Sequence, residues 1–273
     1  MELFMLNVSI DSVHPPPRLR RWVDELQAEG RYNFTKDEAS KATRLVDPNL
    51  RIYLGRLVSK GRLAMPRRGF FVIVPLEHRS QGGPPAPWFL DDLMAAEGRE
   101  YYVALMSAAA IHGASAPPLA ALQVMVESQR RPVQVGHHRI DFFVRPAADL
   151  MPRREVKTPT GTMMVSTPAS TALDLVAYQR DIGGLDRATS LISSFADQID
   201  TYDLLLSARR ASPPTFQRLG FLLEQMGKEE QVEEIEIILR SVKHDIVKLH
   251  PGVPVGDSAF SNRWLLWLND ERG

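Results

Sequence analysis

Residues 59–74, SKGRLAMPRRGFFVIV, restrict the fold of this chain more than any other segment. The two apolar runs, RLAM and FFVIV, favour β-strands, and PRRG between them contains the proline and glycine that favour a turn. The segment therefore predicts a β-hairpin with Arg67 and Arg68 at its tip. No packing requirement places two cations there, so we expect the tip to contact a polyanion.

Helices are predicted before this hairpin. In the first, apolar residues recur at helical spacing over 19–26, and Gly30 ends it. The second begins in FTKDEASKAT, where Thr35 and Glu38 have the spacing of a capping box. The third runs from about Pro48 to Lys60, with Asp47 as its predicted N-cap.

The order of three helices and a hairpin over residues 18–75 predicts a winged helix–turn–helix, whose third helix enters the DNA major groove. The leucines of that helix form an apolar stripe at 50, 54 and 57. Arginine and asparagine off the stripe match base edges, whereas tyrosine and lysine more often contact phosphate. The candidate DNA-binding residues are Thr35, Lys36, Asn49, Arg51, Tyr53, Arg56, Lys60, Arg67 and Arg68.

The charge distribution points the same way. The chain has no net formal charge, with 33 basic and 33 acidic residues, yet residues 1–75 hold 13 basic and 8 acidic residues. Within 44–68 there are seven basic residues and a single acid, Asp47. This asymmetry favours a nucleic-acid contact near the N-terminus, and a solvated basic face is the alternative.

A Gly- and Pro-rich stretch, PLEHRSQGGPPAP, predicts a linker. Two predicted helices, WFLDDLMAAEG and YYVALMSAAAIHG, follow it, and then a β-rich block over roughly 121–166 and a helical second half. RREVKTPTG is expected to be a loop, and the tail, which holds two of the four tryptophans, is expected to pack back on the domain. The predicted fold class is α+β. It comprises an N-terminal arm (1–17), a winged helix–turn–helix (18–75), a linker (76–87) and a mixed α/β domain with a small sheet (88–273).

Catalytic and metal sites have little support. Asp141, followed by Glu155 and Lys157, would resemble a nuclease magnesium site if the strands were adjacent, so a metal-dependent nuclease is kept as an alternative function. His137 and His138 cannot chelate together from a regular strand, because neighbouring side chains point to opposite faces. We therefore expect no enzyme activity, no metal and no cofactor.

The β-rich block also holds many cations. They form either a second nucleic-acid surface or a solvated sheet edge that discourages aggregation. A scaffold that binds a toxin or its RNA through this domain is a third candidate function. The residues concerned are Arg130, Arg131, Arg139, Arg145, Arg153, Arg154 and Lys157.

Several motifs in order, RLVSKGRLAMPRRGFFVIVP, ALMSAAAIHG, VSTPASTALDLV and RLGFLLEQMG, resemble the AbiEi family of abortive-infection antitoxins. The resemblance runs from about residue 18 to the last helices. It implies a type IV toxin–antitoxin regulator that binds inverted repeats in its own promoter, with two copies on the double-stranded DNA. It also implies a nucleotidyltransferase toxin that is counteracted without a stable complex, in phage defence. By position, the DNA contacts fall on Arg51, Tyr53, Arg56, Lys60, Arg67 and Arg68.

Composition narrows the cellular setting. The chain has no cysteine, which fits a reducing compartment. Its N-terminus lacks the basic region and cleavage site of a signal peptide, and no apolar run reaches the ~20 residues that span a bilayer. We expect a cytoplasmic protein without membrane contact. The first 17 residues are longer than the resemblance predicts.

Overall fold

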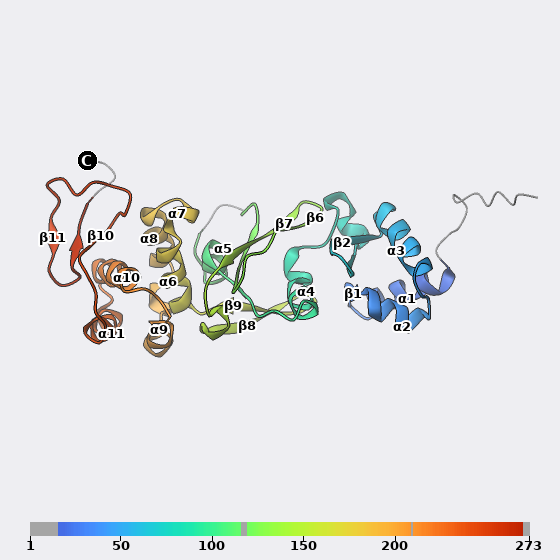
Figure 1. Cartoon of the computed structure of the whole chain (residues 1–273), viewed down its shortest axis with the longest axis horizontal. Coiled ribbons are helices and arrows are strands. Elements are labelled where there is room, and N and C mark those ends of the chain that lie inside the picture. The colour runs from blue at the N-terminus through green and yellow to red at the C-terminus, as the bar shows by residue number, and fades with distance from the viewer. Residues whose placement is uncertain (1–15, 116–118, 209, 270–273) are drawn as a thin grey trace, which may run out of the picture. The chain divides into compact units, whose positions relative to one another are not determined.

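The structure, a computed structural model, describes residues 16–115, 119–208 and 210–269. The predicted N-terminal arm lies almost entirely outside these residues. The chain divides into two compact units, and each is described by itself (Figure 1). Unit 1 comprises the chain up to Ala96 together with Val133–His138, and unit 2 comprises Glu97–Pro132 and Arg139–Gly273. Both contain helices and strands, so the fold class is α+β as predicted.

Unit 1 combines helices with a small antiparallel sheet of order β1-β3-β2. Its core packs Leu19 of the first helix, Leu50 and Leu54 of the third, and Phe34 and Phe71 of paired strands. The elements are α1 (Pro17–Ala28), β1 (Asn33–Thr35), α2 (Lys36–Thr43), α3 (Asn49–Ser59), β2 (Leu63–Arg67), β3 (Phe70–Ile73), the 3-10 helices η2 (Leu76–Gln81) and η3 (Ala86–Trp88), α4 (Leu90–Ala96) and β6 (Val133–Val135).

In unit 1, the sequence predicted a contact correctly where the two interacting residues are close together in the chain. The capping box between Thr35 and Glu38 is confirmed. The prediction that Asp47 caps α3 is wrong, because no side chain caps that helix and Asp47 instead pairs with Lys36. Strand β1 was not predicted, since three residues give no periodic pattern and their pairing with β3 is a long-range contact.

The predicted linker, residues 76–87, is folded into unit 1. The ring of Trp88 packs edge-on against Tyr32 at 5.0 Å and against His78 at 5.1 Å. The Asn33 amide donates to Asp92 at 2.7 Å, which holds α4 against β1. The Gly- and Pro-rich segment is therefore not a linker but contains two 3-10 helices. Aromatic contacts between Trp88 and residues outside the segment's Gly-Pro run hold it in place.

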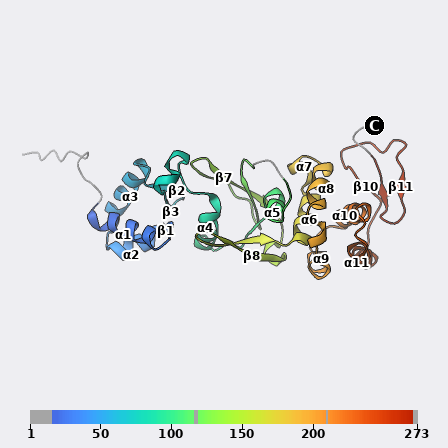
Figure 2. The ribbon, with the colours of Figure 1, turned by 180° about the vertical axis from the view of Figure 1, so that it is seen from behind.

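Unit 2 is built on a sheet in which the strands run β7-β5-β4-β9-β8. Figures 1 and 2 show α6, α7 and α8 packed together, and α10 packed against α11. Its elements are α5 (Leu105–Ile111) and β4 (Tyr102–Val103), β5 (Leu122–Val126), β7 (His138–Val144), η4 (Ala148–Leu150), β8 (Arg153–Thr158), β9 (Gly161–Ser166), α6 (Pro168–Ala177), α7 (Gln179–Ile182), α8 (Leu185–Ser193), η5 (Ala196–Gln198), α9 (Thr201–Ala208), α10 (Pro213–Gln225), α11 (Glu229–Arg240), β10 (Val247–Lys248), β11 (Phe260–Ser261) and β12 (Leu266–Trp267).

Two sequence predictions in unit 2 are corrected. RREVKTPTG was expected to be a loop, but Arg153–Thr158 is β8, which pairs with β9 along its whole length. Its four charged side chains fit an edge strand, whose outer side needs no apolar residues. Tyr102–Val103, expected within a helix, is strand β4 between β5 and β9.

Helix α6 is the centre of unit 2. Every residue from Pro168 to Val176 is buried, and the helix contacts α5, α8, α9 and α10. Thr167 caps it by accepting a hydrogen bond from the Ser170 amide. Asp174 on this helix is fully buried and pairs with the buried Arg145.

The surroundings of that ion pair complete its hydrogen bonds. The hydroxyl of Tyr102 on β4 donates to Asp174 at 3.1 Å, and Arg145 also donates to the carbonyl of Arg210 at 3.2 Å. A carboxylate in an apolar interior is stable only when such partners surround it. The network therefore links α6 to the sheet strand β4 and to the segment after β7.

The C-terminal tail folds back on α10, as its two tryptophans predicted. Trp264 is fully buried, and its indole N–H donates to Glu224 at 2.7 Å. The ring lies directly over Gly220, where a Cβ atom would stand 2.1 Å from the ring carbon Cζ3. Strands β10, β12 and β11 form a small sheet around this contact.

We predict that Gly220→Ala lowers the free energy of unfolding of unit 2 by about 1–3 kcal/mol, because the methyl group overpacks against Trp264. Tryptophan fluorescence during urea unfolding measures the change. Gly55→Ala is the control, since Gly55 is helical, exposed and has no atom within 4 Å of its Cβ position. Equal stability of the Gly220→Ala and wild-type proteins would contradict the packing described.

We predict that Asp174→Asn destabilises unit 2 by about 3–5 kcal/mol, because it leaves the Arg145 guanidinium buried without a counter-charge. Thermal and urea unfolding measure the loss. The double change Asp174→Leu with Arg145→Met removes both charges and should cost less than the single change. A double variant less stable than Asp174→Asn would show that Arg145 does not depend on this carboxylate.

Candidate nucleic-acid interface

Helix α3 separates an apolar face from a polar one. Leu50, Leu54 and Leu57 are buried against the core of unit 1. Asn49, Arg51 and Lys60 are exposed, whereas Tyr53 and Arg56 are half-buried and Tyr53 packs partly against the core. The helix therefore presents side chains capable of hydrogen bonding along the face that packing leaves to solvent.

The hairpin tip lies against the start of α2. Arg67 pairs with Phe70 across the hairpin, so the connecting loop is Arg68–Gly69, and Gly69 has a φ of +85° that glycine adopts without strain. The amide of Lys36 donates to the carbonyl of Gly69 at 2.8 Å. The exposed Arg68 thus stands beside the N-terminus of α2, while Arg67 is half-buried at the end of β2.

The same corner is joined to the start of α3. Lys36 pairs with Asp47, two residues before Asn49. Lys36 therefore connects three segments of the chain: the hairpin tip, the start of α2 and the turn that precedes α3. Together they bring Asn49, Arg51 and Arg68 to one end of unit 1, which we call the tip corner.

One of the predicted contact residues, Thr35, has a structural role. The Thr35 hydroxyl accepts from the Glu38 amide at 3.2 Å and donates to its carboxylate at 3.0 Å, so its hydrogen bonds serve the capping box. Burial raises the pKa of Glu38, but the Thr35 amide and Arg31 lower it more, and the net pKa lies below its usual value. The carboxylate is therefore ionised at neutral pH and supports the first turn of α2.

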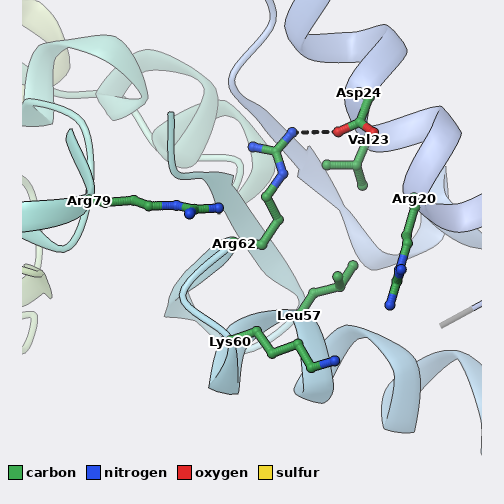
Figure 3. Close-up of a pocket in the computed structure, with 7 residues that line it drawn as sticks. All are labelled: Arg20, Val23, Asp24, Leu57, Lys60, Arg62 and Arg79. Carbon is green, nitrogen blue, oxygen red and sulfur yellow. Dashed lines mark hydrogen bonds and ion pairs between the residues drawn. The ribbon is translucent and has the colours of Figure 1, made fainter. Parts of the chain in front are cut away.

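Lys60 lies away from the tip corner. It stands just after the C-terminal end of α3 and lines a pocket with Arg20, Arg62 and Arg79 (Figure 3). An 11-residue helix is about 16 Å long, so the two groups of cations occupy opposite ends of α3. The predicted set of DNA contacts is thus divided by the structure.

The second predicted nucleic-acid surface is not one surface. Arg145 is buried in the ion pair with Asp174, so its place in that set is wrong. Arg139 on β7 and Lys157 on β8 belong to opposite edges of the unit 2 strands.

Other members of the second set are held by unit 2 itself. Arg130 pairs with Glu97 and covers the Phe142 ring at 4.9 Å. Arg153 pairs with Glu100 at 2.6 Å. Arg154 donates to the Nδ1 atom of buried His112 at 3.2 Å, and Arg131 is exposed.

The nuclease arrangement is contradicted by the sheet order. Asp141 lies on β7 and Glu155 on β8, and β5, β4 and β9 lie between them. Four steps of about 4.8 Å separate such strands by roughly 19 Å, too far for a shared magnesium ion. Asp141 instead pairs with Arg139 at 2.7 Å. Among the residues that the structure describes, no group of three His, Asp or Glu side chains could hold a metal ion.

Comparison with known proteins assigns unit 2. The sequence profile of the AbiEi antitoxin C-terminal domain matches residues 102–225, from β4 to the end of α10. Residues 102–225 belong to the AbiEi antitoxin family. Membership indicates a toxin–antitoxin role and implies a toxin as partner, and the family is generally non-enzymatic. No curated protein matches the sequence of this AbiEi chain.

A solved structure extends the comparison to most of the AbiEi chain. The crystal structure of the RV2827C protein from Mycobacterium tuberculosis is similar with a TM-score of 0.67 and 14% sequence identity. The similarity covers 92% of this chain and 91% of that one. At this identity the comparison shows the fold alone. Within the described residues of the AbiEi chain, no helix is long and apolar enough to cross a membrane.

Sequence reasoning missed two side chains near the cationic residues. Ile52 on α3 is 45% exposed, and Met65 on β2 is 50% exposed. The sequence gives no signal that these apolar residues are exposed, because an apolar side chain is equally compatible with the core. Apolar side chains on a helix that reads DNA contact the methyl group of thymine, so Ile52 is an additional candidate for base contact.

We predict that Thr35→Ala destabilises unit 1 of the AbiEi chain by about 1 kcal/mol through loss of the N-cap.

A second prediction concerns Glu38, whose pKa is lowered in the folded state. Its ionised carboxylate stabilises unit 1 fully above the usual pKa of glutamate, and this stabilisation is lost as the pH falls through the lower folded-state pKa. Glu38→Gln should therefore flatten the acid limb of stability against pH. Circular dichroism at a series of pH values measures it, and an unchanged acid limb would contradict this assignment.

Proposed function

We propose that unit 1 is a winged helix–turn–helix domain that binds double-stranded DNA, and that the chain represses its own promoter. The proposal is supported by the order α1-β1-α2-α3-β2-β3, because three helices followed by a hairpin are typical of a winged helix–turn–helix. The observation that carries the proposal is the tip corner, where the segments connected through Lys36 carry the exposed side chains of Asn49, Arg51 and Arg68.

The roles of these residues follow from their chemistry. Arg51 and Asn49 at the start of α3 would read base edges in the major groove, as arginine does for guanine and asparagine for adenine. Arg68 at the hairpin tip, with Arg67 behind it, would contact phosphate and carry little sequence preference. Ile52 would supply an apolar contact between them.

Two copies are required if the promoter site is an inverted repeat, because each half-site takes one α3. We propose that these copies assemble on DNA and block transcription by occupying the promoter in the cytoplasm. In this proposal the partner is a nucleotidyltransferase toxin of a type IV system acting in phage defence. The antitoxin counteracts it without a stable complex.

We predict that Arg51→Ala weakens binding to the promoter duplex by about 1–3 kcal/mol, and that it relaxes the preference over a scrambled duplex. Arg68→Ala should weaken binding to both duplexes similarly and lower the salt dependence by about one phosphate contact. Fluorescence anisotropy at several salt concentrations measures both changes.

Lys243→Ala, an exposed cation of unit 2, is the matched control for this measurement and should bind like the wild type. Wild-type affinity in both the Arg51→Ala and the Arg68→Ala proteins would overturn the DNA-binding proposal.

The toxin arm is tested separately by co-expression. Rescue of growth from a nucleotidyltransferase toxin, without co-purification of the two proteins, supports the proposal. A stable complex in size-exclusion chromatography would instead favour a scaffold that sequesters its toxin.

A further inference from the structure

Unit 1 contains a pocket of about 360 Å³ at the C-terminal end of α3 (Figure 3). Helix α1 forms one side of it, the end of α3 and the turn between α3 and β2 form another, and η2 contributes one residue. Four basic side chains and one carboxylate line it, above two apolar side chains. The lining residues are Arg20, Val23, Asp24, Leu57, Lys60, Arg62 and Arg79.

The single carboxylate of the pocket is already engaged. Asp24 accepts from Arg62 at 2.7 Å, and Arg62 also donates to the Val74 carbonyl at 3.3 Å. The Arg62 side chain is only 20% exposed. These contacts hold one guanidinium at the pocket wall in a fixed orientation, which lowers the entropic cost of using its remaining N–H groups for a ligand.

The other three cations of the pocket are not paired with a carboxylate of the described residues. Within the part of the chain that the structure describes, Arg20, Lys60 and Arg79 make no ion pair, and all three are exposed. Figure 3 shows Arg79 reaching toward Arg62, with Arg20 and Lys60 across the pocket from it. Converging like charges repel one another, and an anion placed among them would relieve that repulsion.

We infer that this pocket binds a phosphate group. Arginine guanidinium groups bind phosphate oxygens with paired hydrogen bonds, and a lysine adds a point charge. The volume lies near the lower end of the ~300–1,000 Å³ typical of small-molecule sites. The buried side chains of Val23 and Leu57 supply an apolar floor for the remainder of a phosphorylated small molecule.

The position of the pocket separates it from the tip corner, since the two lie at opposite ends of α3. The phosphate can belong to a free phosphorylated molecule or to the backbone of bound DNA. Only the second source rests on the proposed function. Both sources use the same chemistry, so the experiment must distinguish them.

The first measurement is isothermal titration of the full chain with inorganic pyrophosphate, against sodium chloride of equal ionic strength. The test variant combines Arg20→Ala with Arg79→Ala, and the control is Arg21→Ala, an exposed α1 cation that does not line the pocket. We expect binding to weaken about tenfold or more in the double variant and to persist in the control. Arg79→Lys keeps the charge but loses the paired geometry, so it should retain intermediate affinity.

The second measurement repeats the comparison with the promoter duplex by anisotropy. If pyrophosphate does not bind but the double variant loses duplex affinity relative to Arg21→Ala, the phosphate comes from DNA. If the chain binds pyrophosphate through the pocket but no duplex, the proposed function fails and the pocket stands. Pyrophosphate binding that survives in the double variant overturns the inference. The inference is also overturned if pyrophosphate does not bind to the wild-type chain and the double variant binds the duplex as tightly as the control.

Discussion

A charged side chain is stable in the protein interior only when it is paired with an opposite charge, and this constraint determines where the charged residues of both units lie. In unit 2 it forms the centre: Asp174 on the buried helix α6 requires Arg145, and Tyr102 completes the hydrogen bonds of the carboxylate. The sheet and the helices are joined at that network. Arg130 and Arg153, paired with glutamates, follow the same rule nearer the surface.

In unit 1 the same constraint leaves cations at the surface. The leucines of α3 occupy the core, so the polar residues of that helix must face water, and the hairpin adds Arg68 at its tip. Where cations outnumber acids, at the tip corner and in the pocket lined by Arg20, Lys60 and Arg79, the surface is suited to an anion. Both proposals of function start from this contrast between paired and uncompensated charges.

Family membership and proposed chemistry come from different parts of the chain. The AbiEi profile covers residues 102–225, whereas the proposed DNA contacts lie before residue 69. The fold is shared with the RV2827C protein over most of both chains at 14% identity. Such divergence is expected, because cores tolerate many apolar substitutions when volume and pattern persist.

The sequence alone determined the elements whose signals are local: the periodic helices, the capping box at Thr35, the hairpin turn at Gly69 and the apolar stripe of α3. Tertiary structure decided what depends on distant partners. These are the pairing of β1 and β4 into sheets, the position of RREVKT as an edge strand and the burial of Arg145. They also include the separation of Asp141 from Glu155 across the sheet and the position of Lys60 in the pocket wall. The reason is physical: propensity and periodicity act within a few residues, whereas burial and pairing depend on which segments the fold brings together.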